Sequence, residues 1–188
     1  MFKAQILQIY NHPFSDNAPT IYENIRAFKK YSNFDFININ AHNGFPRNLY
    51  NINFQVILLH YSSFLKLSEQ FYAYLKQQNN STIVAFYQDE HINCQKRFNL
   101  INDLNVKVIF TLLDSDFHKI YTDNTNAKEI YHHLTGYVED DMIKIANQLE
   151  KPQNQRKIDI GYRARPLPFF NGKGAQEKTE IGTRFADY

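Results

Sequence analysis

Short apolar runs of strand length alternate with amphipathic stretches of helix length along the first 150 residues. Five runs have the length and apolar content of β-strands, at residues 4–10, 34–40, 54–60, 81–87 and 106–113. Between them, apolar side chains recur at helical spacing. Strict alternation of strand and helix predicts parallel strands joined by right-handed crossovers. The pattern therefore predicts an α/β fold with a doubly wound, mostly parallel sheet and helices on both faces.

Three helices are predicted with particular boundaries. Thr20 and Glu23 have capping-box spacing, which predicts a helix that starts at Thr20. A second helix is predicted over 64–78, and a third over 94–104, facing inward through Phe98 and its apolar neighbours. These helices supply the layers that cover the sheet.

The composition changes near residue 150. The segment 139–150 has helical apolar spacing, and we expect it to pack on the sheet edge. Residues 151–156 contain a proline and no apolar side chain, which indicates a linker. A strand over 157–162 and a helix from about Ala175 follow. One strand and one helix cannot build a core, so we expect 157–188 to dock on the domain 1–150 or to open a second domain.

Composition excludes several classes of protein. The 188 residues are 43% hydrophobic and 21% charged, as in soluble globular proteins. The formal net charge of +2 is too small to indicate a nucleic-acid partner. The single Cys94 excludes an intrachain disulfide and a cysteine-cluster metal site, and it favours a reducing compartment. No apolar run approaches the roughly 20 residues of a membrane helix. We therefore expect a cytoplasmic protein without a membrane span.

Polar side chains follow every predicted strand. In an open α/β sheet, ligands bind beyond the carboxyl ends of the strands, where a carboxylate or imidazole can act as a general base. Polar residues are also expected there because such loops face solvent. The candidates at these ends are His12, His42, His60, Gln88, Asp89, Glu90 and His91. Together they suit a polar, hydroxyl-rich ligand.

Several familiar sites do not fit. No Gly-x-Gly-x-x-Gly follows the first strand, and Gly172-Lys173-Gly174 lacks the spacing of a Walker loop. A receiver domain needs an acidic pair where Asn11 and His12 stand. A metal site at 89–91 is weakly supported, because adjacent side chains of an extended segment point in opposite directions. We therefore expect no metal.

The C-terminal segment has cations between a predicted strand and a predicted helix, where a diphosphate can meet a helix N-terminus. These cations are Arg163, Arg165 and Lys173. An exposed basic tail would have the same composition.

The most recognisable part of the sequence lies between residues 159 and 178. It reads Asp159-Ile160-Gly161-Tyr162-Arg163-Ala164-Arg165-Pro166-Leu167-Pro168-Phe169-Phe170, followed by Gly172 and Gly174-Ala175-Gln176-Glu177-Lys178. It resembles the strand, loop and helix that open the second domain of bacterial two-domain glycosyltransferases of the GT-B fold, of the family 1-like and spore-maturation type. Three earlier segments resemble the same group and occur in the same order along the chain: Ala18-Pro19-Thr20, His60-Tyr61-Ser62 and Tyr87-Gln88-Asp89-Glu90. The chain departs from it at Ala164, where a glycine is usual, and at His91, where a tyrosine is common.

The resemblance implies a metal-independent enzyme of bacterial glycan synthesis that transfers a sugar from a nucleotide-sugar to a hydroxyl acceptor. It implies a Rossmann-like acceptor-side domain at 1–150 and the start of a truncated donor-side domain at 157–188. The implied catalytic base is His60, Asp89 or Glu90. The implied acceptor contacts are His12, Gln88 and His91, and the implied donor contacts are Arg163, Arg165 and Lys173.

On this interpretation the chain alone transfers little or no sugar, because most of the donor site is missing. Sugar transfer that Asp89→Asn abolishes would contradict the truncation. Two alternatives stay open: a non-catalytic, flavodoxin-like binding module whose tail docks on its own sheet, and a small-molecule hydrolase that uses Asp89 or Glu90. The expected partners are a nucleotide-sugar and a glycan or other hydroxyl acceptor, and peripheral membrane association is compatible with the sequence.

Overall fold

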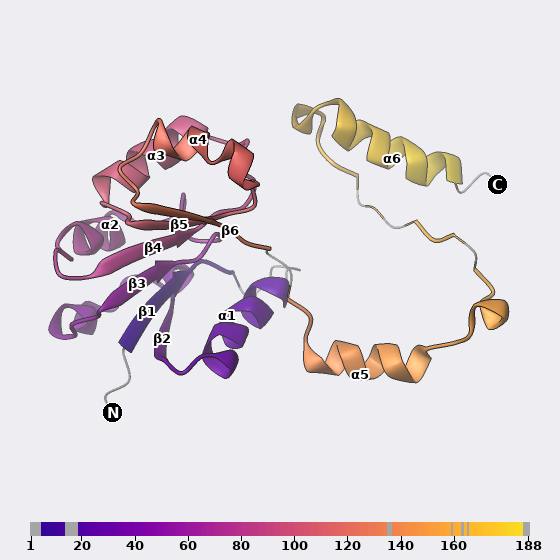
Figure 1. Cartoon of the computed structure of the whole chain (residues 1–188), viewed down its shortest axis with the longest axis horizontal. Coiled ribbons are helices and arrows are strands. Elements are labelled where there is room, and N and C mark those ends of the chain that lie inside the picture. The colour runs from indigo at the N-terminus through magenta and orange to yellow at the C-terminus, as the bar shows by residue number, and fades with distance from the viewer. Residues whose placement is uncertain are drawn as a thin grey trace. The chain divides into compact units, whose positions relative to one another are not determined.

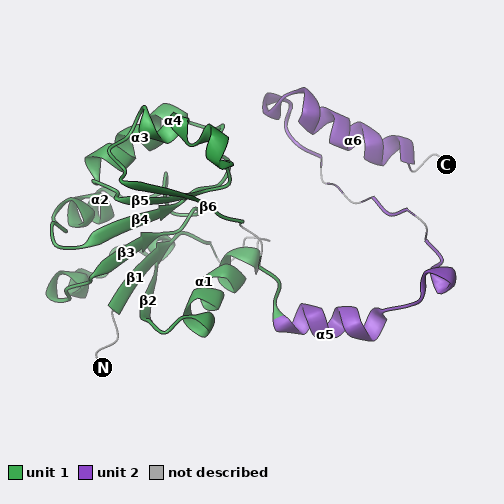
Figure 2. Ribbon diagram, in the orientation of Figure 1, with its two compact units in different colours: residues 1–139 green, residues 140–188 purple. Residues whose placement is uncertain are grey.

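The computed structural model of the chain describes residues 5–13, 19–134, 137–158, 160–162, 164 and 166–185. The chain divides into two compact units, residues 1–139 and 140–188 (Figure 2). Strands and helices of the first unit alternate as predicted, except between β2 and β3, where two 3-10 turns, Ala41–Asn43 and Arg47–Asn51, replace a helix (Figure 1). In chain order they are β1 (Gln5–Tyr10), α1 (Pro19–Tyr31), β2 (Asp35–Asn40), β3 (Val56–Leu59), α2 (Glu69–Lys76), β4 (Thr82–Phe86), α3 (Cys94–Asp103), β5 (Val108–Thr111), α4 (Lys119–Thr122) and β6 (Glu129–His132).

The six strands form one sheet in the order β2-β1-β3-β4-β5-β6, and every neighbouring pair is parallel. This confirms the predicted α/β class and the parallel pairing. The sixth strand was not predicted, because its four residues Glu129-Ile130-Tyr131-His132 lack the apolar run that marks the other five. Hydrogen bonding to β5 stabilises this segment as a strand, although its own sequence has no strand pattern.

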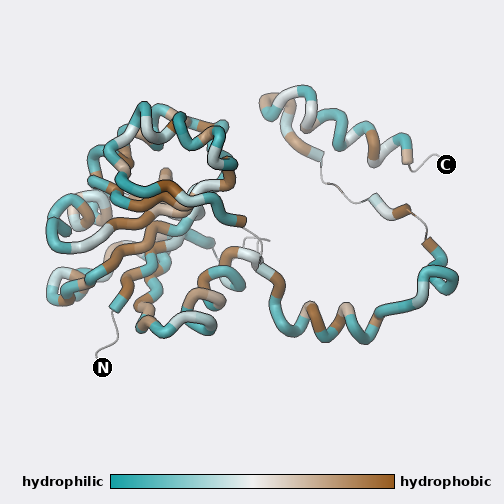
Figure 3. Tube along the Cα trace, viewed as in Figure 1, coloured by the Kyte–Doolittle hydropathy of each residue, from teal (hydrophilic) through white to brown (hydrophobic). Residues whose placement is uncertain are grey.

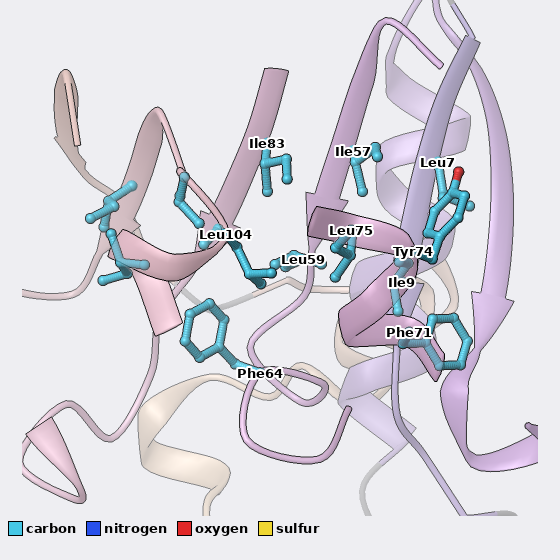
Figure 4. Packing of buried hydrophobic residues seen from close by; sticks show 14 of the residues in the cluster. Leu7, Ile9, Ile57, Leu59, Phe64, Phe71, Tyr74, Leu75, Ile83 and Leu104 are labelled. Atoms are coloured by element: carbon cyan, nitrogen blue, oxygen red, sulfur yellow. The ribbon is translucent and has the colours of Figure 1, made fainter. Parts of the chain in front are cut away.

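The main core lies between the sheet and α2, α3 and α4 (Figure 4). Alternate residues of the strands, such as Leu7, Ile57 and Ile109, are fully buried on this face. Phe71, Tyr74 and Leu75 of α2 pack against them. Each fully buried side chain of this size stabilises the fold by roughly 1.5–3 kcal/mol relative to an exposed one.

The opposite face of the sheet has a smaller core. Ile6, Leu58 and Phe86 are buried there, and Phe28 of α1 packs against them. Farther along this face, Phe110 stacks between Phe86 and Tyr131, whose side chain is 46% exposed. The central strands are largely hydrophobic, whereas hydrophobic and hydrophilic residues follow one another along the helices (Figure 3). Helices therefore lie on both faces, as predicted.

One predicted helix cap and one predicted helix start differ from the structure. Thr20 is the second residue of α1, not its cap, and Pro19 takes the first helical position, where a missing N–H costs nothing. The helix predicted over 64–78 begins only at Glu69, because the side chain of Ser68 accepts a hydrogen bond from the backbone of Phe71 and caps it. Phe64 nevertheless points inward and is 1% exposed.

The second unit contains α5 (Asp140–Leu149) and α6 (Lys173–Phe185), with short 3-10 turns at Gln153–Gln155 and Phe169–Asn171. Both helices were predicted. The strand predicted over 157–162 is wrong for the residues that the structure describes there, which form no strand. A strand needs a hydrogen-bonded neighbour, and none of the described residues pairs with this segment.

Side-chain hydrogen bonds connect Tyr162 of this segment, and Leu167 just after it, to α6 instead. The hydroxyl of Tyr162 donates to the carbonyl of Lys178 at 2.8 Å, and the amide of Gln176 donates to the carbonyl of Leu167 at 3.1 Å. How 139–150 and 157–188 pack against the sheet stays a prediction. Across the described parts of the chain, no helix has both the length and the apolar character needed to cross a bilayer.

Candidate functional site

The strand order places a topological switch point between β1 and β3, because the chain proceeds from β1 to β2 on one side and continues from β3 on the other. Ligands of open α/β sheets bind beyond the carboxyl ends of the strands at such a point. The loops after β1, β2 and β3 bring four polar residues together there. We call His12, Asn40, His60 and Ser62 the switch-point cluster.

Hydrogen bonds of the switch-point cluster run mainly to the backbone. Oδ1 of Asn40 accepts from the backbone N–H groups of His12 and His42, and Nδ2 of Asn40 donates to the carbonyl of His12 at 2.8 Å. Oγ of Ser62 accepts from the backbone N–H of Asn11 at 3.1 Å. The neighbouring Ser63 donates to the carbonyls of Ile9 and His60. These bonds tie the loops after β1, β2 and β3 to one another.

His60 is fully buried in this cluster. Its Nδ1 accepts the backbone N–H of Ser62 at 3.2 Å and lies 2.8 Å from the Ser62 hydroxyl, so the ring proton belongs on Nε2. Burial lowers the pKa of His60 to about 3, and the nearby His12 and His133 contribute to the same direction. The imidazole is therefore neutral at ordinary pH and out of contact with solvent.

A second polar group lies at the ends of β4 and β5. Oε1 of Glu90 accepts the hydroxyl of Thr111, the last residue of β5, and the hydroxyl of Tyr121 in α4 at 2.7 Å. Thr111 is fully buried and also accepts the backbone N–H of Leu113 at 3.1 Å. Burial, followed by the bond to Glu90, raises the pKa of Tyr121, so its hydroxyl remains a neutral donor. We call Glu90, Arg97, Thr111 and Tyr121 the Glu90 cluster.

Arg97 of α3 is 8% exposed. Its Nε donates to the carbonyl of Ile92 at 2.9 Å and its Nη2 to the carbonyl of Asp89 at 3.3 Å, while the guanidinium lies over the ring of Tyr87. Within the described residues it forms no salt bridge with a carboxylate. Arg97 therefore fixes the loop after β4 and keeps a buried positive charge beside Glu90.

That loop, residues 89–93, is locally strained. Asp89 and Asn93 have φ values of 54° and 55°, in the left-handed region, which Asp and Asn occupy more readily than other residues with a Cβ but less readily than glycine. Asn93 precedes α3 without a side-chain cap. Cys94, the first residue of α3, donates its thiol to the carbonyl of Glu90 at 2.9 Å. These contacts hold Glu90 in one orientation.

A cavity of about 270 Å³ opens beside the Glu90 cluster. Glu90, Arg97 and Tyr121 contribute its polar lining. Most of the remaining wall is apolar, from α3, the loop after β5, the 3-10 turn Ser115–Phe117 and α4: Cys94, Phe98, Leu113, Phe117 and Ile120. His91 completes the rim. The site can thus hold an apolar group next to a carboxylate.

The residues predicted as catalytic divide between the two clusters. Side chains of β3 alternate between the two faces of the sheet, and by this alternation His60, which follows β3, lies on the face that α1 covers. Its neighbour His133 packs against Phe86 on that face. Glu90 instead binds Thr111 and Tyr121, which belong to the α2–α4 side. Their hydrogen bonds run to different partners, so the structure does not join them in one network.

The remaining predicted site residues lie as follows. Gln88 is half-buried, Asp89 and His91 are exposed, and His12 is buried with its ring edge-on to Tyr22 at 4.4 Å. Lys173 is the first residue of α6 and is exposed. Arg163 and Arg165 lie outside the described residues. The catalytic, acceptor and donor roles of all these residues stay predictions.

Sequence reasoning missed Thr111, Tyr121 and Arg97. Thr111 is a polar residue within the apolar run 106–113, which is a usable signal for a buried hydroxyl with a partner. Arg97 and Tyr121 carry no such local signal, since only the packing of α3 and α4 brings them to Glu90. In the described part of the chain, no three His, Cys, Asp or Glu side chains are grouped as ligands for a metal ion.

Neither a protein-family model nor a curated protein matches this chain.

Proposed function

We propose that this chain is part of a cytoplasmic, metal-independent glycosyltransferase that moves a sugar from a nucleotide-sugar to a hydroxyl acceptor, with the acceptor bound by residues 1–139. The observation that carries the proposal is the fixed carboxylate of Glu90 beside a cavity at the carboxyl edge of the sheet. The resemblance of residues 159–178 to the start of a donor-side domain supports it.

Glu90 is a better base for an acceptor hydroxyl than His60. Two hydroxyls hold Oε1 of Glu90, while none of the described residues donates to Oε2. By contrast, the His60 ring is fully buried and its pKa is lowered to about 3. A base must reach the proton that it removes, and the enclosed His60 ring cannot, whereas Glu90 borders a cavity.

In the proposed reaction, Oε2 of Glu90 takes the proton of the acceptor hydroxyl. The acceptor oxygen forms a bond with the anomeric carbon of the donor sugar. The bond between that carbon and the diphosphate breaks, and the nucleoside diphosphate leaves with the electron pair. Thr111 and Tyr121 keep the carboxylate oriented throughout, which preserves the geometry on which general-base catalysis depends.

The donor contacts are assigned to the second unit. Lys173 starts α6, a helix of 13 residues, so the cation and the helix N-terminus can act together on a phosphate. Lys178, in the same helix and also exposed, is the matched control. We expect no metal and no nucleic-acid partner in this reaction, and peripheral membrane association is compatible with it.

Ligand-induced shifts of the melting temperature test the proposal on the full chain. Nucleotide-sugars and nucleoside diphosphates should raise the melting temperature, and Lys173→Ala should reduce that shift while Lys178→Ala leaves it unchanged. Methyl glycosides should raise it independently of Lys173. If neither class of compound shifts the transition at millimolar concentration, the proposal is wrong.

The strand order favours one second candidate. The order β2-β1-β3-β4-β5 is that of flavodoxin-like domains, which bind ligands at the β1/β3 switch point. A non-catalytic binding module of this kind would dock its C-terminal segment. Amide exchange distinguishes the two: protection of residues 166–185 equal to that of Val56–Leu59 supports the module, and fast exchange supports a segment of a donor-side domain.

A further inference from the structure

We infer that the cavity beside Glu90 binds an aromatic alcohol, with the ring among the apolar walls and the hydroxyl between Glu90 and Arg97. This inference rests on the proposed function, because it names the class of acceptor. The inference can nevertheless be tested separately from the proposed function, because binding of the alcohol is measured without any sugar transfer.

The size and lining of the cavity favour an aromatic ring. An apolar cavity of about 150 Å³ can bind benzene, so about 270 Å³ accommodates a ring with a small substituent. Phe98 offers an aromatic surface at one wall, and Leu113 offers an aliphatic one. Phe117 and Ile120 are 63% and 41% exposed, which is unfavourable for such large apolar side chains unless something covers them.

The polar side of the cavity favours a hydroxyl rather than a carboxylate or an ammonium. Arg97 is 8% exposed and bonds only backbone carbonyls within the described residues, so it can donate to a ligand oxygen. Glu90 retains Oε2 as an acceptor. A ligand carboxylate would be attracted by Arg97 but repelled by Glu90, and an ammonium would be attracted by Glu90 but repelled by Arg97, so neither ion suits both groups. A hydroxyl accepts from one group and donates to the other.

The geometry gives Glu90→Gln a specific consequence. The hydroxyls of Thr111 and Tyr121 both donate to the Oε1 position, so the glutamine carbonyl should take that position. The glutamine NH₂ then replaces Oε2, and it cannot accept a proton from the ligand hydroxyl. The variant keeps the shape of the cavity and removes one hydrogen bond.

The test is a titration of the full chain with 4-methylphenol, followed by amide chemical shifts. We expect saturable shifts at residues 90–98 and 113–121 with a dissociation constant of about 1 mM or lower. The ether 4-methylanisole, which cannot donate a hydrogen bond, should bind about tenfold more weakly. In Glu90→Gln that preference should fall to about twofold or less.

Two further measurements locate the ligand. Phe117→Ser should weaken binding at least about fivefold, whereas Phe34→Ser, at a side chain that is 50% exposed and outside the cavity, should leave it unchanged. Because Cys94 is the chain's one cysteine and lines the cavity, 4-methylphenol should also slow its alkylation by iodoacetamide. Each result supports occupancy of this cavity.

Shifts that do not saturate, shifts at other residues, or equal effects of Phe117→Ser and Phe34→Ser would overturn the inference. Binding of 4-methylphenol without any response to nucleotide-sugars would support the inference and count against the proposed function. A response to nucleotide-sugars and methyl glycosides, with no binding of 4-methylphenol, would support the proposed function and overturn the inference.

Discussion

The switch-point cluster and the Glu90 cluster lie at the same edge of the same sheet, yet they use polar side chains in different ways. In the switch-point cluster, Asn40 and Ser62 bond mainly to backbone groups of neighbouring loops. In the Glu90 cluster, two hydroxyls bond one carboxylate, which borders a cavity. The first arrangement fixes the chain, and the second leaves polar atoms available for a ligand.

Burial separates the two clusters in the same way. His12, Asn40 and His60 are at most 7% exposed. Glu90 is half-buried, and Asp89 next to it is exposed. Asn40 and Ser62 are hydrogen-bonded within the protein and stabilise the loops, while the buried Nε2 of His60 has no partner among the described residues. A charged group held at a cavity rim can instead act on a second molecule. Four experiments test this division.

The largest expected effect concerns the pH dependence of stability through His60. Its pKa of about 3 in the folded chain is below the ordinary value of 6.5, so between these pH values the unfolded chain binds more protons at this residue. The free energy of unfolding should therefore fall as the pH falls, by up to about 1.4 kcal/mol per pH unit. Urea unfolding at pH 6 and pH 4 should show about 2–3 kcal/mol more loss in the unchanged chain than in His60→Gln. Equal losses would show that His60 is not the closed, neutral group described above.

Asn40→Ala should lower the free energy of unfolding by about 2 kcal/mol, because it leaves backbone groups of His12 and His42 without their side-chain partner. Asn38→Ala, two residues earlier on β2 and exposed, should change it by less than about 0.5 kcal/mol. Both values follow from urea denaturation at pH 7. A small effect at Asn40 would mean that these bonds do not stabilise the loops.

Thr111→Val should cost about 1–1.5 kcal/mol, since it removes the donor to Glu90 and the acceptor for the N–H of Leu113 while keeping the volume of the side chain. Thr122→Val is the control, because its exposed hydroxyl only bonds within α4. It should cost less than about 0.5 kcal/mol in the same urea titration. If Thr111→Val is neutral, the carboxylate of Glu90 is not held as the structure shows.

The smallest expected effect concerns the strained loop of the Glu90 cluster. Asn93 has a φ of 55°, so Asn93→Ala should be about 1 kcal/mol less stable than Asn93→Gly, which has no Cβ. The same pair of changes at Asn105, with a φ of 52°, should give a similar difference away from the cavity. Thermal unfolding measures both pairs. Equal stability of the Ala and Gly variants at position 93 would show that the loop relaxes and does not hold Glu90 rigidly.

The fold was largely predictable because its information is local. The five apolar runs identified five strands, and their alternation with helices required parallel pairing. The sixth strand was missed, since Glu129–His132 becomes a strand only by pairing with β5. The strand expected over 157–162 failed for the opposite reason, because a β-like sequence without a neighbour among the described residues has no hydrogen bonds to make.

The candidate site was predictable only in part. The rule that ligands bind at the carboxyl ends of strands led to His60 and to residues 88–91, and all of them lie at that edge. It could not show that His60 would be closed off on the α1 face while Glu90 met Thr111 and Tyr121 on the other. Which way a residue just past a strand end points depends on the loop that follows, and sequence spacing does not specify that direction.

Hydrophobic periodicity by itself determined the class of fold, because burial of apolar side chains is a short-range pattern that strands and helices express residue by residue. Tertiary structure decided which polar residues became partners. Arg97 lies seven positions after Glu90 and Tyr121 lies 31 after it, and only the packing of α3 and α4 on the sheet brings both to one cavity. Hydrogen bonds depend on distance and direction in space, so the chemistry of this edge emerged only once the chain was folded.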